Sequence, residues 1–300
     1  MEYNVSPLLK SESEVENQQP LLDDSYAYAK ELDPLTKHQY CYIERKIEHG
    51  WITERDLEII KFLFVHRWAT LSQISRIFFP ETDREGTVRN RIKKLMKFGL
   101  LRKLSWTSYS KRSENKPSFY EIGASGADIL KFRFGKFLGQ RDPRAPRETT
   151  MLFRMRYVVT NEFYIQLSNS FNLNHFEFHP KLELSDEQQI PTAQFSLINP
   201  KGKILLFYLV CHRDDEKWLK TLRFQAQFYR QFLKVKNAIL ILLVSTTEKA
   251  IIAHQVLDQE EAINNIWFIT DEELFNSTKE ITQSFFTFND ARQKQYYDLR

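Results

Sequence analysis

The chain has 300 residues, of which 42% are hydrophobic and 14% aromatic, enough material for two domains with separate cores. The sequence contains no run of 18 apolar residues and no basic, apolar leader pattern, so neither a membrane span nor a secretion signal is predicted and a cytoplasmic location is expected. Cys41 and Cys211 are the two cysteines and form no CxxC pair, which argues against a zinc ribbon or a disulfide framework.

The charge is unevenly distributed along the chain. The formal net charge is +4, but the segment from Trp51 to Arg147 holds 21 Lys and Arg against 10 Asp and Glu, a net charge of +11. The remaining residues together carry −7. A strongly basic segment inside a nearly neutral chain is typical of a surface that binds a negatively charged partner.

Residues 1–34 are rich in Ser, Glu, Asp, Gln and Asn and show no sustained hydrophobic period. Such a segment buries too little apolar surface to offset the entropy of ordering it, so we expect a disordered acidic arm. Aromatic residues and Ile at irregular helical spacing between Pro34 and Gly50 predict a short helix that packs on the domain that follows.

Three helices are predicted next, each from an apolar repeat with recognisable ends. The first begins after Thr53, an N-cap followed by acidic residues, and the second begins at Thr70 and stops before Pro80. The third runs from about Asp83 to Gly99, a residue suited to a helix C-terminus. Its predicted buried face consists of Val88, Ile92, Leu95 and Gly99, and its opposite face of Asn90, Lys93, Lys94 and Lys97.

A strand, a polar basic tip and a second strand follow the third helix. The strands are LLRKLSW and SFYEI, the tip is the segment from Thr107 to Pro117, and GASGADILKFRF restarts a helical pattern. Three helices followed by a long-tipped hairpin predict a winged helix-turn-helix over residues 35–139. This fold presents a positive helix and a positive hairpin on one surface, and the partner expected for that surface is double-stranded DNA.

The predicted DNA-contacting residues fall into two sets. Residues in the N-terminal part of the third helix would approach base edges, and these are Arg84, Glu85, Thr87, Asn90 and Arg91. Lysines further along the helix and cations of the hairpin would contact phosphates, and these are Lys93, Lys94, Lys97, Lys103, Lys111, Arg112 and Lys116. A solvated charged helix face is the alternative explanation for the lysines.

The sequence pattern changes after residues 140–147, QRDPRAPR, which have the composition of a linker. In residues 148–300 a helix is followed by three strands, a helix, the apolar run AILILLVS, another helix and IWFIT. The first strands predict a hairpin and the later alternation predicts parallel strands with helices on both faces, so the fold class is α+β and α/β with a mixed sheet.

Three phrases resemble the replication-relaxation family of plasmid and mobile-element proteins. They are ITERDLEIIKFLFVHRWATLSQISRIFFP, KKLMKFGLLRK and FYEIGASGADIL, the last being similar to the Y-x-L-T-x-x-G ending of the family's winged domain. The resemblance implies that residues 148–300 form a restriction-endonuclease-like core. It also implies a role in plasmid or mobile-element replication or mobilisation.

A nuclease with this core needs carboxylates on two neighbouring strands, because they hold Mg²⁺. The resemblance puts P-D and E-x-D at these places. This chain has Pro191-Thr192 at the first place and Val210-Cys211-His212 at the second. Four acids lie nearby in sequence but off these positions: Glu183, Asp186, Asp214 and Asp215. The residues therefore favour a degenerate nuclease fold that provides assembly or partner contacts.

Two further patterns are weaker. His175, Glu177 and His179 alternate along a predicted strand with a spacing that could hold zinc, but polar residues on the exposed side of a strand are the commoner explanation. Tyr229 lies in an aromatic stripe at helical spacing, which is typical of a core. We predict no catalytic residue, no metal and no cofactor.

The sequence predicts a non-enzymatic, sequence-selective protein that binds double-stranded DNA. The expected partners besides DNA are replication or conjugation proteins and a second copy of the chain. One alternative is a winged-helix transcriptional regulator whose second domain dimerises. The other alternative is a metal-dependent endonuclease or nickase.

Overall fold

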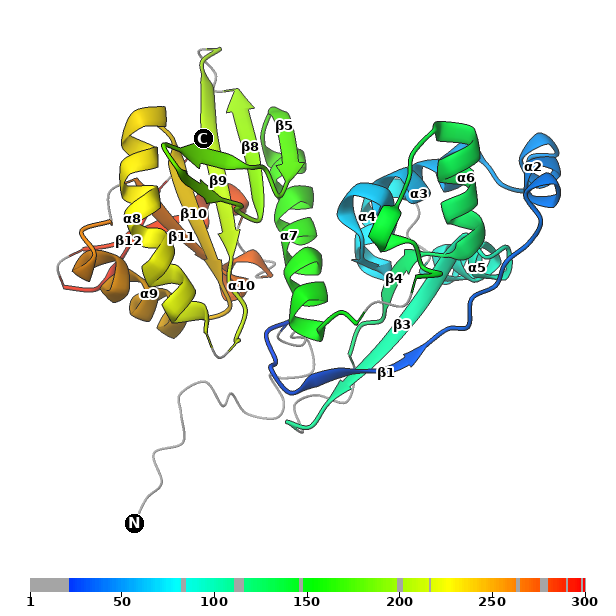
Figure 1. Ribbon diagram of the computed structural model, residues 1–300, viewed down its shortest axis with the longest axis horizontal. Coiled ribbons are helices and arrows are strands. Elements are labelled where there is room, and N and C mark those ends of the chain that lie inside the picture. Colours follow the sequence, from blue (N-terminus) through cyan, green and yellow to red (C-terminus); the bar gives the residue numbers. More distant parts are fainter. Residues whose placement is uncertain are drawn as a thin grey trace.

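The computed structural model describes residues 22–81, 85–110, 116–145, 148–198, 202–215, 217–262, 265–275, 280–289, 291–297 and 299. Figure 1 shows two parts, an N-terminal half (residues 22–145) and a C-terminal half (residues 148–299). Together they make a mixed α/β protein, as the sequence predicted. Within the described residues, no helix is long and apolar enough to span a bilayer.

The N-terminal half consists of helices packed on a small sheet. Its elements are β1 (Ala27–Leu32), α2 (Tyr40–Glu48), α3 (Glu54–His66), β2 (Ala69–Thr70), α4 (Leu71–Phe78), α5 (Glu85–Lys97), β3 (Leu101–Ser108), β4 (Phe119–Ile122) and α6 (Ala124–Phe134). The sheet order is β1-β3-β4-β2, with every neighbouring pair antiparallel. The predicted three helices and hairpin are therefore all present.

The helix starts follow the capping chemistry read from the sequence. At α3 the Thr53 backbone N–H donates to Asp56 at 2.7 Å, and at α4 the Thr70 hydroxyl accepts from the Gln73 N–H at 3.2 Å. Both are capping boxes, which satisfy backbone donors that a helix start would otherwise leave unpaired. Sequence-local chemistry thus fixes where these two helices begin.

The C-terminal half is a seven-stranded mixed sheet with helices on both faces. The strand order is β13-β12-β11-β10-β9-β8-β5. The central strands β9 (Ile204–Cys211), β10 (Ile239–Val244) and β11 (Ile266–Thr270) are parallel, and β8 (Ala193–Ile198) and β5 (Leu173–Phe178) continue antiparallel. The predicted mixed sheet is confirmed. The small strands β6 (Leu182–Leu184), β7 (Glu187–Gln189), β12 (Phe286–Phe288) and β13 (Lys294–Tyr296) and the short helix α10 (Asp271–Leu274) complete it.

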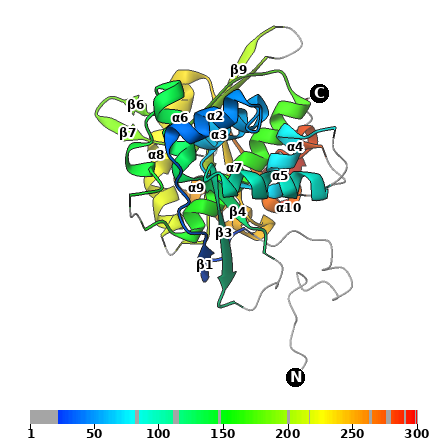
Figure 2. The same cartoon turned by 90° about the vertical axis from the view of Figure 1, so that its right-hand side faces the viewer.

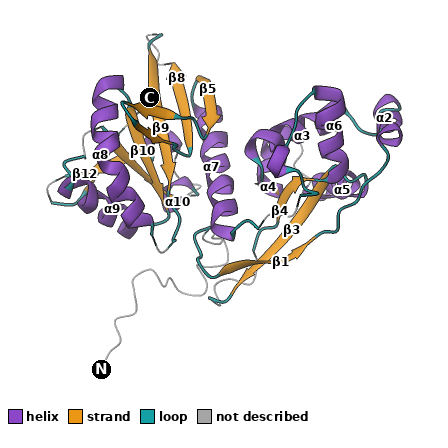
Figure 3. Ribbon diagram, viewed as in Figure 1, coloured by secondary structure: helices purple, strands orange, loops and turns teal. Residues whose placement is uncertain are grey.

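Strand β10 explains the apolar run AILILLVS. Its side chains alternate between two cores, with Ile241 and Leu243 in one and Leu240 and Leu242 in the other. The helix α7 (Met151–Ser170) covers the first face, and α8 (Trp218–Lys236) and α9 (Thr247–Gln259) cover the second (Figure 3). A strand buried on both faces must be apolar at every position, not at alternate ones.

The face of α7 that points away from the sheet packs against the N-terminal half (Figure 1). Asn161 joins the two halves, because its amide donates to the Trp68 carbonyl at 2.6 Å and its oxygen lies 2.9 Å from His66 Nδ1. Arg76 pairs with the buried Glu162, with one N–O distance of 2.8 Å. The hydrophobic core of α7 also includes Trp68 and Trp106. The domain boundary at residues 140–147 stays a prediction, because the two halves share this core.

The expectation of a disordered arm through residue 34 is wrong for residues 22–32. Here β1 adds to the edge of β3, from Ala27 opposite Ser108 to Leu32 opposite Leu104. Leu22 is only 3% exposed and lies in the core of α7. The segment is polar, but main-chain pairing and buried contacts offset the cost of ordering it. Residues 1–21 lie outside the described residues.

Candidate nucleic-acid interface

Helix α5 is the element on which the DNA-binding prediction depends. Its inner face is buried as expected, with Val88, Ile92 and Leu95 at most 1% exposed. The helix ends at Gly99, whose φ is +68° and whose N–H donates to the Met96 carbonyl at 2.8 Å. A left-handed glycine that closes the helix in this way turns the chain sharply into β3. Figure 2 shows α5 on the side facing the viewer, not covered by the C-terminal half.

The outer face of α5 is polar, basic and exposed. Four predicted contact residues lie on it with exposed side chains: Thr87, Asn90, Lys93 and Lys97. In the part of the chain that the structure describes, neither lysine has a carboxylate partner. Two cations without compensation on one side of a helix are available to bind phosphates.

Two other predicted residues of α5 are engaged within the protein. Arg91 donates through Nε to the Asp56 carboxylate at 2.9 Å and also through Nη2, and Asp56 is completely buried at the start of α3. Arg91 therefore holds α5 against α3, and the expectation that it approaches base edges does not fit this pairing. The Lys94 ammonium lies 5.4 Å from the centre of the Trp51 ring and is half-buried. Arg84 lies outside the described residues.

The β3–β4 hairpin is less accessible than predicted. Lys103 is half-buried on β3, with its N–H donating to the carboxylate of Asp33 just beyond β1 at 3.4 Å. The Lys116 ammonium lies 4.6 Å from the centre of the Trp106 ring and 3.8 Å from the Asp24 carboxylate. Burial lowers the pKa of Lys116, and Asp24 acts in the opposite direction. Lys116 would have to leave Asp24 to meet DNA. Lys111 and Arg112 lie outside the described residues.

The model of the replication-relaxation family matches residues 60–182. Residues 60–182 are a replication-relaxation region. The match confirms the resemblance seen in the sequence, and it runs from α3 through α7 to β6, across residues 140–147. It therefore includes the contacts between the two halves. Comparison with curated proteins and with solved structures gave no match.

Packing explains the glycine in the family's Y-x-L-T-x-x-G ending, which reads YEIGASG in this replication-relaxation region. Gly126, the last residue of that phrase, lies in the first turn of α6, where the helix meets the chain leaving α5. A Cβ atom at Gly126 would be 2.4 Å from the Leu100 carbonyl oxygen, and one at Gly123 would be 2.4 Å from the Gly99 carbonyl oxygen. Side chains are excluded at both positions because the obstacle is backbone. The glycines thus hold α6 against the turn that positions α5.

The two strand positions where the resemblance puts acids have other uses in this fold. The Thr192 hydroxyl accepts the Cys211 N–H at 2.9 Å, at the junction of β8 and β9. His212 is 7% exposed, and burial, followed by the positive charges of Arg156 and Arg213, lowers its pKa to about 3. Neither side chain is a carboxylate, and both are enclosed.

A buried ion pair occupies the carboxyl ends of the parallel strands, where α/β folds commonly bind ligands. Arg213, just after β9, donates to both oxygens of Asp271 at 2.6 and 3.0 Å, with the two side chains 0% and 3% exposed. Burial disfavours the charged guanidinium, but the Asp271 carboxylate outweighs it and holds the pKa of Arg213 above its usual value. The N-terminal segment covers the pair: the Leu22 carbonyl accepts from Arg213 at 3.2 Å and Asp23 binds Lys249 at 2.9 Å.

The histidine pattern considered for zinc is not assembled. The side chains of His175 and Glu177 are about half exposed, and His179 lies 2.7 Å from the Tyr157 hydroxyl at a position of positive φ. Over the described residues, no three His, Cys, Asp or Glu side chains are grouped to hold a metal ion. Cys41 and Cys211 are both free thiols, and Tyr229 is 1% exposed in the core under α8.

Proposed function

We propose that this chain is a non-enzymatic, sequence-selective double-stranded DNA-binding protein whose N-terminal half is a winged helix-turn-helix. The observation that carries the proposal is the exposed, uncompensated cationic face of α5. The replication-relaxation match supports a role in the replication or mobilisation of a plasmid or mobile element. Replication or conjugation proteins are the partner class that this role implies, with a second copy of the chain as a further partner.

The dimensions and chemistry of α5 suit the major groove. A helix of 13 residues is about 20 Å long and fits a groove about 12 Å wide. Asn90 can pair with the adenine edge through its amide, since Asn offers a donor and an acceptor side by side. Lys93 and Lys97 lie one and two turns further on, where they would release counterions from phosphates.

Replacing Asn90 with Ala should relax sequence preference at one or two base pairs, at a cost of about 1–3 kcal/mol for the preferred site. Affinity for unrelated DNA should stay the same, because phosphates are not involved. Competition binding with a library of sites measures both effects. Asn169→Ala, at an exposed helical asparagine of α7, is the matched control. Equal losses on preferred and unrelated DNA would assign Asn90 to the backbone.

The proposal of a non-enzymatic protein is supported by Thr192 and His212 at the positions where a nuclease of this fold needs carboxylates. A hard cation such as Mg²⁺ binds oxygen ligands, and neither a single hydroxyl nor a buried imidazole replaces paired acids. Supercoiled plasmid incubated with the purified chain and Mg²⁺ or Mn²⁺ should remain intact. Nicking that copurifies with the chain and disappears in Asp214→Ala or Asp215→Ala would make the chain an enzyme.

A further inference from the structure

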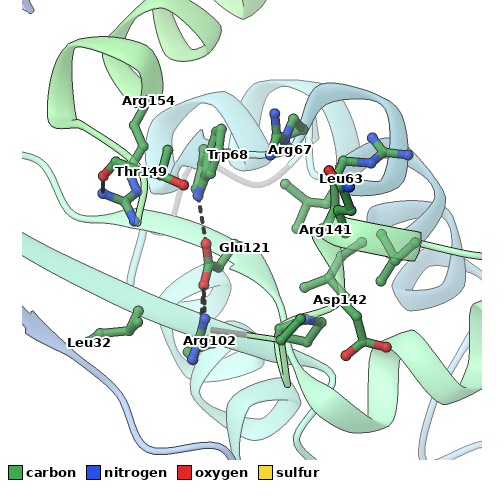
Figure 4. Close-up of a pocket in the computed structure, with 15 residues that line it drawn as sticks. Leu32, Leu63, Arg67, Trp68, Arg102, Glu121, Arg141, Asp142, Thr149 and Arg154 are labelled. Atoms are coloured by element: carbon green, nitrogen blue, oxygen red, sulfur yellow. Dashed lines mark hydrogen bonds and ion pairs between the residues drawn. The ribbon is translucent and has the colours of Figure 1, made fainter. Parts of the chain in front are cut away.

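A cavity of about 300 Å³ lies where the two halves meet (Figure 4). Its walls come from the end of α3, the base of the β3–β4 hairpin, residues 138–145 and the start of α7. Leu63 and Ile122 contribute apolar surface. Four arginines also line the cavity: Arg67, Arg102, Arg141 and Arg154.

The positive charge around this cavity is not balanced. Glu121 accepts from Arg102 at 2.8 Å and from the Trp68 indole at 2.6 Å, so it compensates one arginine (Figure 4). Asp142 lines the cavity too but accepts three hydrogen bonds from Arg144, which does not line it.

The other three arginines of the cavity have no carboxylate partner in the described part of the chain. Arg141 donates to the Phe64 carbonyl at 2.9 Å, and Arg154 donates to the Thr149 carbonyl at 2.6 Å. Arg67 contacts only aromatic faces, with its guanidinium carbon 4.5 Å from the centre of the Trp68 ring. Arg154 is 9% exposed, and its Nε has no hydrogen-bond partner.

Arg67 is held in an unusual backbone conformation. Its φ is 59° and its ψ is −60°, and the Trp68 N–H donates to the His66 carbonyl at 2.7 Å, which makes a tight three-residue turn with positive φ. A non-glycine residue in such a turn is strained and persists only where its surroundings enforce it. Strain of this kind concentrates at binding sites, and here it places a guanidinium at a cavity wall.

The arginines repel one another across the cavity. Burial lowers the pKa of Arg141, and the charge of Arg67 lowers it further. Burial also lowers the pKa of Arg154, and Arg102 and Arg67 act in the same direction against Glu121. An anion placed among these groups would remove a repulsion that the protein alone tolerates.

We propose that the cavity binds a small phosphate-bearing molecule of about the size of a mononucleotide. A phosphate offers several strong acceptor oxygens, and guanidinium groups match it with paired N–H donors. A volume of about 300 Å³ falls at the lower end of small-molecule sites. The apolar wall then takes the rest of the molecule. A phosphate can also come from free inorganic phosphate or from a DNA backbone, and the experiment separates these sources.

Calorimetric titration of the full chain with dAMP, inorganic phosphate and duplex DNA tests the proposal. Saturable binding of dAMP with one site per chain is expected, and weaker binding of inorganic phosphate. Arg67→Gln and Arg141→Gln should each weaken dAMP binding by about tenfold or more, the loss that follows from one charge-assisted hydrogen bond. Arg223→Gln, at an exposed arginine of α8, should leave it unchanged.

Thermal melting separates a binding role from a structural one. Without dAMP, the Gln variants should melt no lower than the wild type by more than a few degrees, because lost contacts are offset by relief of repulsion. The rise in melting temperature that dAMP gives the wild type should vanish in them. Arg141→Lys keeps the charge without the paired donors and should bind dAMP with intermediate affinity.

Three results would overturn the proposal. The first is no saturable binding of dAMP or inorganic phosphate to the wild type at millimolar concentration. The second is binding that survives both Gln substitutions. The third is a loss of duplex binding in the Gln variants while the wild type ignores both small molecules, which would assign the arginines to the DNA surface. None of these results depends on whether α5 binds DNA.

Discussion

Replacing Asp271 with Ala is expected to lower the free energy of unfolding by about 3–5 kcal/mol. The substitution leaves the Arg213 guanidinium charged and enclosed, because both side chains of the pair are almost completely buried. Removal of one partner from such a pair costs far more than the pair itself contributes, since the remaining charge keeps its desolvation penalty. Urea unfolding followed by circular dichroism measures the change.

A matched control and a double variant test this explanation. Asp258→Ala removes an exposed carboxylate from α9 and should change stability by less than about 1 kcal/mol. Replacing both partners, as in Arg213→Met with Asp271→Leu, should recover much of the loss because no unpaired charge remains. A loss for Asp271→Ala as small as that of Asp258→Ala would contradict the buried position of the pair.

Stability should fall steeply as the pH is lowered from about 6.5 to 4. Burial lowers the pKa of His66 to about 4, against the smaller opposing effect of Asn161, and lowers that of His212 to about 3. The unfolded chain, with its ordinary histidine pKa of 6.5, therefore takes up these protons first. The contribution is fully present above pH 6.5 and is lost as the pH falls toward the folded-state values. Burial also lowers the pKa of His179 and His254, which adds to the slope.

The expected slope is about 2.7 kcal/mol per pH unit for the two buried histidines together, since each differential proton contributes about 1.36 kcal/mol per unit. Unfolding free energies measured at several pH values within this window give the slope directly. His66→Gln should remove about half of it, and His49→Gln, at an exposed histidine of the N-terminal half, should leave it unchanged. A flat profile would show that the two buried rings are not enclosed.

The parts of the fold that could be predicted from the sequence are those governed by local chemistry. Thr53 and Thr70 start helices because their side chains and the residues three positions later satisfy backbone groups within one turn. Gly99 ends α5 because a left-handed residue is needed there. The apolar run around Ile241 is a central strand because both of its faces are covered. Each of these signals is contained in a short stretch of chain.

The features that the sequence did not predict depend on contacts between distant residues. The order of residues 22–32 comes from pairing with β3 and from Asp23 binding Lys249, 226 positions away. The positions of Arg91 and Lys116 beside acids decide how far each is available to DNA, and neither acid adjoins its partner in sequence. Arg67 gave no signal, because its strain is visible only in the backbone.

Shared packing changes how the C-terminal half should be regarded. Asn161 and Glu162 on α7 bind groups of the N-terminal half, and the replication-relaxation region extends across the contact. The segment 139–145 is also attached, since Arg144 pairs with Asp128 at 2.7 Å. Proteolysis between residues 140 and 147 should therefore leave two fragments that stay associated, in place of the two independent pieces that the linker composition suggested.

The central claim is that α5 grips DNA through its cationic face, and the salt dependence of binding tests it most directly. Replacing Lys93, Lys94 and Lys97 with Ala should weaken binding to every DNA sequence and reduce the slope of log affinity against log salt by up to about 3 units, since each phosphate contact contributes about 0.9. The triple Ala variant of Lys220, Lys234 and Lys236, exposed on α8, makes the same change in charge and should keep the wild-type slope. If the α5 variant keeps the wild-type slope as well, α5 does not contact DNA and the proposed function is wrong.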